Sequence, residues 1–538
     1  MSTGVFTLPE PVNEPVREYA PGSPERSSLK ATLDEMSGRQ VEIPMVIGGE
    51  EVRTGRTADV VMPHDHQHVL GQYHQGGEAE VARAIAAAAE GRREWAAMSW
   101  EARAAVFLRA AELLTGPWRD TINAATMLGQ SKTAFQAEID AACELADFWR
   151  WNVSYMHRLM SEQPTSSRGM WNRIEYRPLE GFVFAVAPFN FTAIAGNLPT
   201  APAMMGNTVI FKPASFTPMM AVRLVEILEE AGLPKGVLNL VLGSGSDLGD
   251  HIVKHPNVDL ISFTGSSDTG AHISEIAGRL LKRVSAELGG KNAIIVLDDA
   301  DVDLSLEGIV WSAFGTSGQR CTAASRVIAH RGIANDLIDK LVGRAKKMKM
   351  GHGLEASTDL GPVVSRAAQE KVASYMPIAE KEGATIAAGG RIPTEGALGK
   401  GFFHEPTVLV DVKPNMRVAQ EEIFGPVTSV IEVSNIDEAI KVLNNTKYGL
   451  SSSVYTRNVN NAFRFMRDAE TGIVYVNAGT IGAEIQLPFG GMKATGNGHR
   501  EAGRAALDVY SEWKSIYVDY SGKLQRAQMD TDGQGKAP

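Results

Sequence analysis

The stretch Gly181-Phe182-Val183-Phe184-Ala185-Val186-Ala187-Pro188-Phe189-Asn190-Phe191 indicates the fold of the middle of the chain. It is an apolar run that ends in a proline-containing turn, which is typical of a buried strand. Similar runs follow it and alternate with helical patterns such as Met219–Ala231. This alternation predicts a parallel, doubly wound α/β sheet, with ligands beyond the carboxyl ends of the strands. The predicted strands are Val183–Ala187, Thr208–Phe211, Val237–Val241 and Leu260–Phe263.

The apolar segment from Phe182 to Phe211 is long enough to be considered as a membrane span. Polar residues and prolines interrupt it, and a span would leave these groups without partners in lipid. We therefore interpret the segment as a buried strand, an active-site turn, a helix and a second strand. The interrupting residues are Pro188, Asn190, Asn197, Pro199, Pro202 and Asn207.

The composition is that of a globular protein with more than one domain. The chain has 538 residues, is 44% hydrophobic and carries a formal net charge of −10. A length of this size suffices for two or three domains, and the acidic balance without a long basic run argues against nucleic acid as a main partner. Two cysteines, Cys143 and Cys321, make no disulfide framework, and Met1 to Glu18 does not resemble a signal peptide. We expect a cytoplasmic protein without a membrane anchor.

Cys321 is the candidate nucleophile. It lies in Ser317-Gly318-Gln319-Arg320-Cys321-Thr322-Ala323-Ala324-Ser325-Arg326, where small neighbours leave a thiol accessible to a substrate. A thiol attacks as thiolate, and Arg320 supplies a positive charge that favours ionisation. The alternative is a buried packing residue, which is a common role for cysteine.

Three further stretches contain groups that such a nucleophile needs. Glu287, in Glu287-Leu288-Gly289-Gly290-Lys291-Asn292, is a candidate general base. Asn190 is a candidate for one half of an oxyanion hole. Gly265 and Ser266, in a turn between strand and helix, can present backbone N–H groups to a pyrophosphate. Taken singly, each stretch is also explained as a turn or a core element.

The combination and order of these motifs resemble the NAD(P)-dependent aldehyde dehydrogenase superfamily, from about Ile43 to Val518. The resemblance implies a Rossmann-type doubly wound cofactor domain, an α/β catalytic domain and a β oligomerisation flap. It implies that Cys321 attacks an aldehyde, that the Asn190 amide and the Cys321 N–H hold the oxyanion, and that Glu287 activates water to hydrolyse the thioester. Three further motifs occur in the family's order: Lys212-Pro213-Ala214, Glu421-Glu422-Ile423-Phe424-Gly425-Pro426 and Pro488-Phe489-Gly490-Gly491-Met492-Lys493.

The resemblance also implies a nicotinamide cofactor. Lys212 would hydrogen-bond the adenosine ribose, Glu422 the nicotinamide ribose, and Phe424 would lie against the nicotinamide ring. At Ser215 many NAD-specific members carry Glu, so we expect NAD as main cofactor with NADP tolerated, and no metal. The expected cofactor-binding residues are Lys212, Ser215, Gly245, Gly249, Gly265, Ser266, Glu422 and Phe424.

The substrate is expected to be an amino acid semialdehyde. The first half resembles the 1-pyrroline-5-carboxylate dehydrogenases, which oxidise glutamate γ-semialdehyde to glutamate in proline catabolism. Thr480-Ile481-Gly482-Ala483-Glu484-Ile485 and Thr322 are more similar to the α-aminoadipic semialdehyde group. A broad-range aldehyde dehydrogenase, an acyl-transferring relative and a non-catalytic structural relative are the alternatives. The expected substrate-binding residues are Glu144, Phe191, Arg320, Thr322, Gly482 and Ala483.

The expected organisation has four parts. Residues 1–42, rich in Pro, Glu and Ser, would be an arm on the surface. Residues 43–155 and 178–288 would bind NAD(P), and residues 289–500 would form the catalytic domain. Residues 156–177 and 501–538 would form the flap and a C-terminal tail. Exposed strand edges in the flap favour pairing between chains, so a homodimer or homotetramer is expected.

Overall fold

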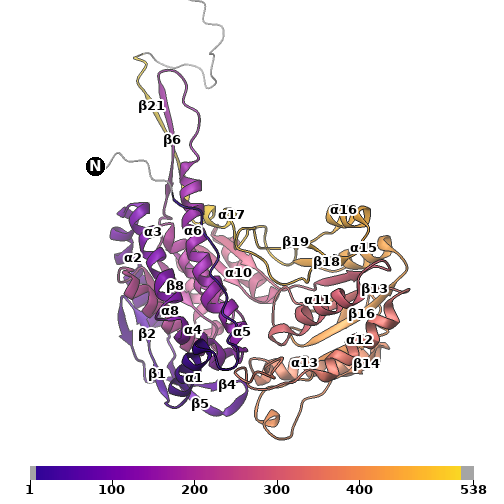
Figure 1. Cartoon of the computed structure of the whole chain (residues 1–538). Helices are drawn as coiled ribbons and strands as arrows, with labels where there is room; N and C mark the ends of the chain where they lie inside the picture. The colour runs from indigo at the N-terminus through magenta and orange to yellow at the C-terminus, as the bar shows by residue number, and fades with distance from the viewer. Residues whose placement is uncertain (1–7, 523–538) are drawn as a thin grey trace, which may run out of the picture.

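The computed structural model describes residues 8–522. Two α/β lobes lie side by side, and a two-stranded sheet projects from the first lobe (Figure 1). The first lobe contains most of the first half of the chain, and the second contains residues from about 293 to 500. The expected α/β architecture is therefore confirmed.

The first lobe is built on a seven-stranded sheet of order β11-β10-β7-β8-β9-β2-β3. The first five strands in this order are parallel, and β2 and β3 extend the sheet with antiparallel pairing. The four predicted strands are confirmed to within two residues. The strands are β2 (Met45–Ile47), β3 (Glu50–Val52), β7 (Phe182–Val186), β8 (Val209–Lys212), β9 (Leu238–Leu240), β10 (Val258–Thr264) and β11 (Arg283–Glu287).

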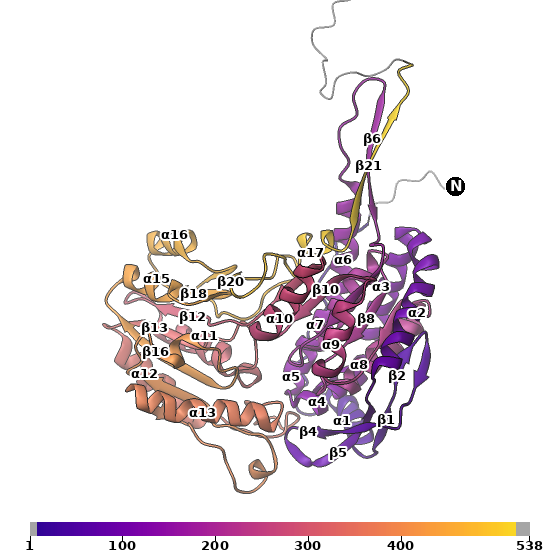
Figure 2. The same cartoon turned by 180° about the vertical axis from the view of Figure 1, so that it is seen from behind.

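Helices cover both faces of this sheet, and α9 and α10 lie on the face toward the viewer in Figure 2. The segment from Phe182 to Phe211 forms β7, α7 and most of β8, as expected. Within residues 8–522, no helix combines the length and apolarity needed to span a membrane. The helices are α2 (Glu78–Ala97), α3 (Trp100–Thr115), α4 (Arg119–Gln130), α7 (Thr192–Met204), α8 (Pro218–Ala231), α9 (Gly245–Lys254) and α10 (Ser267–Arg279).

One long helical stretch of the first lobe contains a π-helical segment that the sequence did not reveal. It runs through α5 (Ala134–Ala137), the π-helix η1 (Glu138–Cys143) and α6 (Glu144–Ser161). π-helical turns are rare and occur often at functional sites. Here the turn carries two acidic residues, Glu138 and Asp140, whose side chains are fully buried.

The second lobe contains another seven-stranded sheet, of order β14-β15-β16-β13-β12-β18-β19. Its strands are parallel except β14, which pairs antiparallel with β15. Apolar clusters lie on both faces of this sheet. Its strands and helices are β12 (Ala293–Val296), α11 (Val302–Phe314), β13 (Arg326–His330), α12 (Ala334–Lys347), α13 (Arg366–Glu382), β14 (Thr385–Ala388), β15 (Thr407–Val410), α14 (Arg417–Gln420), β16 (Val427–Val433), α15 (Ile436–Asn444), β18 (Ser451–Tyr455), α16 (Val459–Asp468) and β19 (Ile473–Val476).

Shorter elements complete the structure. β1, β5 and β4 form a small sheet, and β17 pairs with β20. These elements are β1 (Val41–Ile43), β4 (Thr57–Met62), β5 (Asp65–His74), the 3₁₀ helices η2 (Gly315–Gly318) and η3 (Leu398–Lys400), β17 (Tyr448–Gly449), β20 (Met492–Lys493) and α17 (Ala505–Asp508).

The expectation that the first 42 residues lie on the surface is wrong for part of this segment. Residues 24–37 form the helix α1 (Pro24–Ser37), whose Leu29, Leu33 and Met36 are buried in the core of the first lobe. Tyr19 is also buried, and its hydroxyl donates to Glu138 in the π-helix (2.9 Å). The high content of Pro, Glu and Ser concealed these few apolar anchors. Residues 1–7 lie outside the described part of the chain.

The projecting sheet pairs β6 (Met170–Arg177) with β21 (Glu512–Asp519) in antiparallel register, as the flap prediction required. Residues 501–511 were expected to belong with this flap and the tail, but they pack on the first lobe. The Tyr510 ring is buried and its hydroxyl lies 3.0 Å from the Ser262 hydroxyl in β10. Residues 523–538 of the expected tail lie outside the described residues.

Candidate active site

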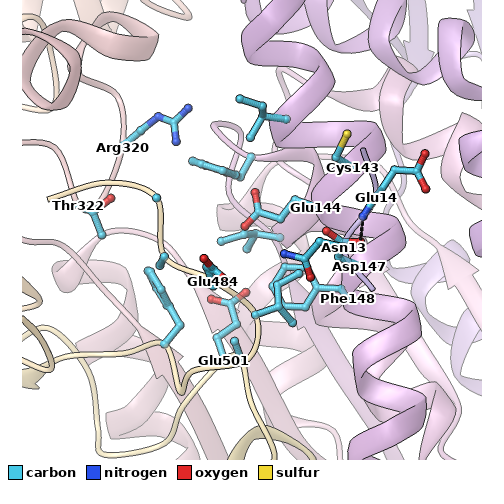
Figure 3. A pocket seen from close by; sticks show the side chains of 18 of the residues that line it. Asn13, Glu14, Cys143, Glu144, Asp147, Phe148, Arg320, Thr322, Glu484 and Glu501 are labelled. Carbon is cyan, nitrogen blue, oxygen red and sulfur yellow. Dashed lines mark hydrogen bonds between the residues drawn. The ribbon is translucent and has the colours of Figure 1, made fainter. Parts of the chain in front are cut away.

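A cavity of about 290 Å³ lies between the π-helix region of the first lobe and the loops of the second lobe. Figure 3 shows Arg320 and Thr322 at one side, Asn13, Asp147 and Phe148 at the other, and Glu144 between them. Cys321 lines this cavity. Of the expected substrate-binding residues, all six line it: Glu144, Phe191, Arg320, Thr322, Gly482 and Ala483.

The loop before Cys321 has an unusual backbone. Thr316, Ser317 and Gly318 in η2 have successive φ angles of 54°, 55° and 66°. Left-handed conformations of this kind are costly outside glycine and cluster at active sites. At Gly318 a Cβ would lie 2.1 Å from the carbonyl oxygen of Gly425, so only glycine permits this close approach to the Glu-Ile-Phe-Gly-Pro loop.

Two side chains from neighbouring segments hold the backbone around Cys321. The Asn292 amide donates to the carbonyl oxygen of Cys321 (2.7 Å) and to that of Ala323 (3.0 Å). The Thr480 hydroxyl donates to the carbonyl oxygen of Thr322 (2.7 Å). The nucleophile loop is therefore fastened to the Glu287–Asn292 motif and to the segment that contains Gly482 and Ala483.

Asn190 lies beside the same loop. It follows β7 and precedes α7, and its amide donates to the carbonyl oxygen of Gln319 (2.9 Å). The side chain is 7% exposed. Because an amide nitrogen carries two hydrogens, one remains for a substrate oxygen. The structure thus brings together Asn190 and the backbone of the residues adjoining Cys321.

Glu287 ends β11 and is 5% exposed. Neither of its carboxyl oxygens has a hydrogen-bond partner among residues 8–522. Burial, reinforced by the charge of Glu501, raises the pKa of Glu287 well above its usual range. A Cβ at Gly490 would lie 2.4 Å from one carboxyl oxygen, so the Pro-Phe-Gly-Gly turn makes room for this side chain. A buried, unpaired carboxyl of this kind is suited to proton transfer.

The environment of Cys321 differs from the expectation. Burial, followed by the charges of Glu501, Glu422 and Glu287, raises the pKa of the thiol, and Arg320 lowers it by less. Arg320 therefore favours ionisation of the thiol, as expected, but burial and the three carboxyl groups outweigh its charge. The guanidinium of Arg320 is also bound to Asp140 (3.0 and 3.1 Å), an acidic residue distant in sequence.

Several cavity residues were missed by sequence reasoning. Glu501 and Glu484 come from the C-terminal part of the chain, and Asp147 from α6. Asn13 and Glu14 belong to the N-terminal arm, where Glu14 N donates to Asp147 (2.7 Å; Figure 3) and Trp151 donates to Asn13 (2.9 Å). The neighbouring tryptophans and arginines of α6 were the available signal, but only the folded chain shows that the arm lies against them.

Burial raises the pKa of three of the acidic side chains that line the cavity. Burial, with the charge of Asp140 as the next cause, raises the pKa of Glu144 to about 8. Burial likewise raises the pKa of Glu501 to about 8, and that of Asp147 to about 6. At neutral pH, Glu144 and Glu501 are therefore mainly neutral hydrogen-bond donors, which lowers the negative charge that an anionic ligand would meet.

The expected cofactor residues meet at the carboxyl ends of parallel strands. Lys212 ends β8, and Gly245 and Gly249 follow β9 in α9. Burial lowers the pKa of Lys212 to about 8, and within residues 8–522 its ammonium hydrogen-bonds only to the carbonyl oxygen of Pro213 (3.3 Å). A Cβ at Gly245 or Gly249 would meet no atom within 4 Å. The Lys212 amine, which has no anionic partner within residues 8–522, suits a ribose hydroxyl. The open surface at Gly245 and Gly249 suits an adenine.

The other expected cofactor groups line the same side of the site. Ser215 donates to the carbonyl oxygen of Gly243 (3.3 Å). Gly265 follows β10 and Ser266 caps α10, accepting from Thr269 N (3.3 Å). The N-terminus of α10 therefore presents backbone N–H groups at this edge.

Glu422 and Phe424 lie between the cofactor edge and Cys321. Glu422 accepts from the N–H of Gly290 (2.8 Å), and a Cβ at Gly289 would lie 2.4 Å from its second oxygen. The Phe424 ring packs edge-on against Phe189 (5.9 Å between centroids), in the same turn as Asn190. The structure thus joins three of the motifs that the sequence placed far apart.

The family model "Aldehyde dehydrogenase family" matches residues 51–516. The segments that carry Cys321, Glu287 and Asn190 lie together at the carboxyl edge of the first sheet. The chain belongs to the aldehyde dehydrogenase family.

Within that family the chain is similar to 1-pyrroline-5-carboxylate dehydrogenases. It is 38% identical to the Delta-1-pyrroline-5-carboxylate dehydrogenase of Agaricus bisporus, over 96% of each chain. It is 37% identical to 1-pyrroline-5-carboxylate dehydrogenase 2 of Bacillus subtilis, over 90% of this chain and 94% of that one. A crystal structure of the Mycobacterium tuberculosis enzyme bound with NAD has a TM-score of 0.91 at 37% identity and covers 98% of this chain and 99% of that one.

The raised pKa of Glu144 predicts a pH-dependent stability. Because its pKa in the folded protein exceeds that in the unfolded chain, the stabilisation is complete below about pH 4.5 and is lost as the pH rises through about 8. Between pH 6 and 8.5 the free energy of unfolding of the wild type should fall more steeply than that of Glu144→Gln, by up to about 1.4 kcal/mol per pH unit. Urea titrations at several pH values measure this, and parallel curves would refute the assignment.

Proposed function

We propose that the protein oxidises glutamate γ-semialdehyde, the open form of 1-pyrroline-5-carboxylate, to glutamate with NAD. The observation that carries the proposal is the placement of Cys321, with the Asn190 amide beside its loop, on the wall of a cavity lined by buried carboxyl groups. Full-length similarity to 1-pyrroline-5-carboxylate dehydrogenases from a fungus and a bacterium supports the choice of substrate.

In the proposed reaction, the sulfur of Cys321 attacks the aldehyde carbon and the thiol proton passes to solvent. The negative charge that develops on the carbonyl oxygen is held by the Asn190 amide and the Cys321 N–H. NAD, when bound, accepts the hydride from this carbon, which leaves a thioester on Cys321. Glu287 then takes a proton from water, whose oxygen attacks the thioester, so that glutamate and the thiol are released.

Glu287 and Cys321 have complementary roles in this proposal. Both pKa values are raised by burial, so a carboxylate at Glu287, once formed, is a stronger base than an exposed glutamate. Its lack of hydrogen-bond partners leaves it free to contact water. Acyl-transferring relatives generally lack this glutamate, and a non-catalytic relative would be expected to lack one of the three groups. The presence of all three favours hydrolysis.

For the cofactor, we propose that residues 43–155 and 178–288 bind NAD at the carboxyl edge of the first sheet. Lys212 would hydrogen-bond the adenosine ribose, and Gly245 and Gly249 would leave space for the adenine. Gly265 and Ser266 would face the pyrophosphate, while Glu422 and Phe424 would face the nicotinamide end. The M. tuberculosis relative, whose structure contains NAD, supports this arrangement. Residues 289–500 would supply the catalytic loop.

For the substrate tail, we propose that the cavity binds an α-amino acid group rather than an alkyl chain. Gly482, with φ of 98°, and Ala483 offer backbone N–H groups to a carboxylate. Glu144 lines the cavity, where its carboxyl group would contact the polar tail of the substrate, and Phe191 would lie against the methylene groups. An α-aminoadipic semialdehyde is one methylene longer and remains the second candidate, because Gly482-Ala483 suits it equally.

We further propose that the chain forms a homodimer or homotetramer through the flap. Trp171, Trp513 and Tyr517 on β6 and β21 are 43%, 59% and 73% exposed. Large aromatic side chains on a projecting two-stranded sheet favour association with another chain. Light scattering that gave a monomer mass would contradict this.

A cytoplasmic location remains an expectation, and one relative, from Dictyostelium discoideum, is described as mitochondrial.

The chemical roles predict two distinct kinetic defects. Cys321→Ala should abolish aldehyde oxidation, since no thiohemiacetal forms. Glu287→Gln should give one equivalent of reduced cofactor rapidly and then slow turnover, because the thioester accumulates. Stopped-flow absorbance of the reduced cofactor measures both. Full steady-state activity of Glu287→Gln would show that another group is the base.

The proposed tail binding predicts a preference between two aldehydes of equal length. Glutamate γ-semialdehyde should have a kcat/KM about ten thousand times that of pentanal, because buried polar groups that lose their partners disfavour the alkyl analogue. Initial rates over a range of concentrations give both values. Equal efficiencies would instead identify a broad-range aldehyde dehydrogenase.

Ser215 predicts the cofactor preference. A carboxylate there would repel the 2′-phosphate of NADP by ~1 to ~4 kcal/mol, for charges about 4 Å apart at dielectric constants from 80 to 20. Ser215→Glu should therefore lower kcat/KM for NADP relative to NAD by roughly tenfold to several hundredfold. Ser215→Gln, of similar size but uncharged, is the control and should change the ratio little. An unchanged ratio in Ser215→Glu would mean that this residue does not face the ribose.

A further inference from the structure

We propose that Asp140 is a positioning residue that holds the Asn190 turn and the Cys321 loop in a fixed relation. This inference rests on the proposed roles of Asn190 and Cys321. Asp140 lies in the π-helix η1 and is fully buried, with no part of its side chain exposed. The sequence assigned it no role, and its side-chain hydrogen bonds within residues 8–522 are to Lys132 and Arg320, each of which contacts one of the two loops.

The Asp140 carboxylate binds two cations. The Lys132 ammonium donates to Oδ2 (2.7 Å), and the Arg320 guanidinium donates to Oδ1 (3.0 Å) and Oδ2 (3.1 Å). Lys132 and Arg320 are themselves 2% and 7% exposed. Charge-assisted bonds in a buried site have short lengths and defined directions, so they fix geometry better than surface ion pairs do.

Each cation passes this constraint to one of the two loops. Lys132 also donates to the backbone carbonyl oxygen of Asn190. Arg320 directly precedes Cys321, and its Nε donates to Thr316 Oγ1 (3.0 Å) in the strained η2 turn. One carboxylate is therefore connected, through a single side chain on each side, to the proposed oxyanion donor and to the proposed nucleophile.

The ring of Phe191 completes the cluster. The Lys132 nitrogen lies 4.6 Å from its centroid, and the central carbon of the Arg320 guanidinium lies 4.8 Å from it. Cation–π contacts of this kind are attractive within about 6 Å. Phe191 follows Asn190 in the chain, so the turn is held both through its backbone and through this ring. The link from the Asn190 amide to Gln319 closes the connection between the loops.

The π-helix explains how this residue reaches the site. The residues that form α5, η1 and α6 are continuous, and the wider turn at 138–143 directs Glu138 and Asp140 into the interior. Glu138 binds Arg119, Asn123 and Tyr19, away from the two reacting loops. The same turn therefore carries Glu138, whose partners lie outside the site, and Asp140, whose partners lie in it. A variant that removes a partner of Glu138 is a matched control for variants of Asp140.

The proposal predicts a loss of rate that is separate from a loss of stability. Asp140→Asn leaves two buried cations without a carboxylate, so it should lower Tm. It should also slow the burst of reduced cofactor about a hundredfold, since a displacement of about 1 Å of reacting groups has effects of this size. The KM for NAD should change less than twofold, because the proposed cofactor edge lies elsewhere.

The double variant Lys132→Met/Asp140→Asn distinguishes positioning from structural support. It restores the net charge of the cluster, so Tm should rise above that of Asp140→Asn. The connection to Asn190 stays broken, and the burst should remain slow.

Lys132→Met alone should also slow the burst at least tenfold, which keeps the test decisive if Asp140→Asn does not fold. Tyr19→Phe, which loses a bond to Glu138 in the same turn, should lower Tm slightly and leave the burst rate unchanged.

Two results would overturn the proposal. The first is a burst rate in Lys132→Met and Asp140→Asn within twofold of the wild type. The second is a double variant in which Tm and burst rate recover together, as expected of support alone. Failure of the proposed function would differ from both, because Cys321→Ala would then retain a burst.

Discussion

The hydrogen bonds from the Asn292 amide to the carbonyl oxygens of Cys321 and Ala323 hold the candidate site together. The first sheet ends at Glu287 and the second begins at Ala293, so residues 288–292 form one of the links between the two lobes. A link this short gives the two sheets little freedom. Because Asn292 lies in it, the loop that carries the nucleophile is fixed relative to the glutamate that would activate water.

Burial sets the chemistry of the groups that this link brings together. The pKa values of Cys321, Glu287, Glu144 and Glu501 are all raised, with burial as the largest cause. Arg320, which directly precedes Cys321, is bound to Asp140 and lowers the pKa of the thiol by less than burial raises it.

The sequence predicted the sheet of the first lobe because its strands are short apolar runs with clear turns, as at Val183–Ala187. It also predicted which motifs meet, since parallel strands place their carboxyl ends at one edge. It did not predict the π-helix, because the apolar spacing of residues 134–161 is that of an ordinary long helix. The partners of Arg320 were likewise unpredictable, since Asp140 lies 180 residues away in the chain.

The composition of residues 1–42 wrongly predicted that this whole segment lies on the surface, because the contacts that hold it are also distant in sequence. Prolines and glutamates dominate it, yet Tyr19 and the buried face of α1 hold it on the first lobe. Glu14 is fixed by Arg119 (2.6 Å) and Arg150 (2.8 Å), two arginines more than a hundred residues away. Pairing between distant charged residues leaves no local pattern in a sequence. The acidic wall of the cavity therefore became visible only in the folded chain.

The central claim is that the aldehyde carbon becomes bonded to Cys321. Its most direct test is peptide mass spectrometry of Glu287→Gln, quenched in acid within the burst after mixing with NAD and glutamate γ-semialdehyde. We expect the peptide containing Cys321 to gain the mass of a glutamyl acyl group, in an amount equal to the burst. An unmodified Cys321 peptide, or the adduct on Cys143, the only other cysteine of the chain, would contradict it.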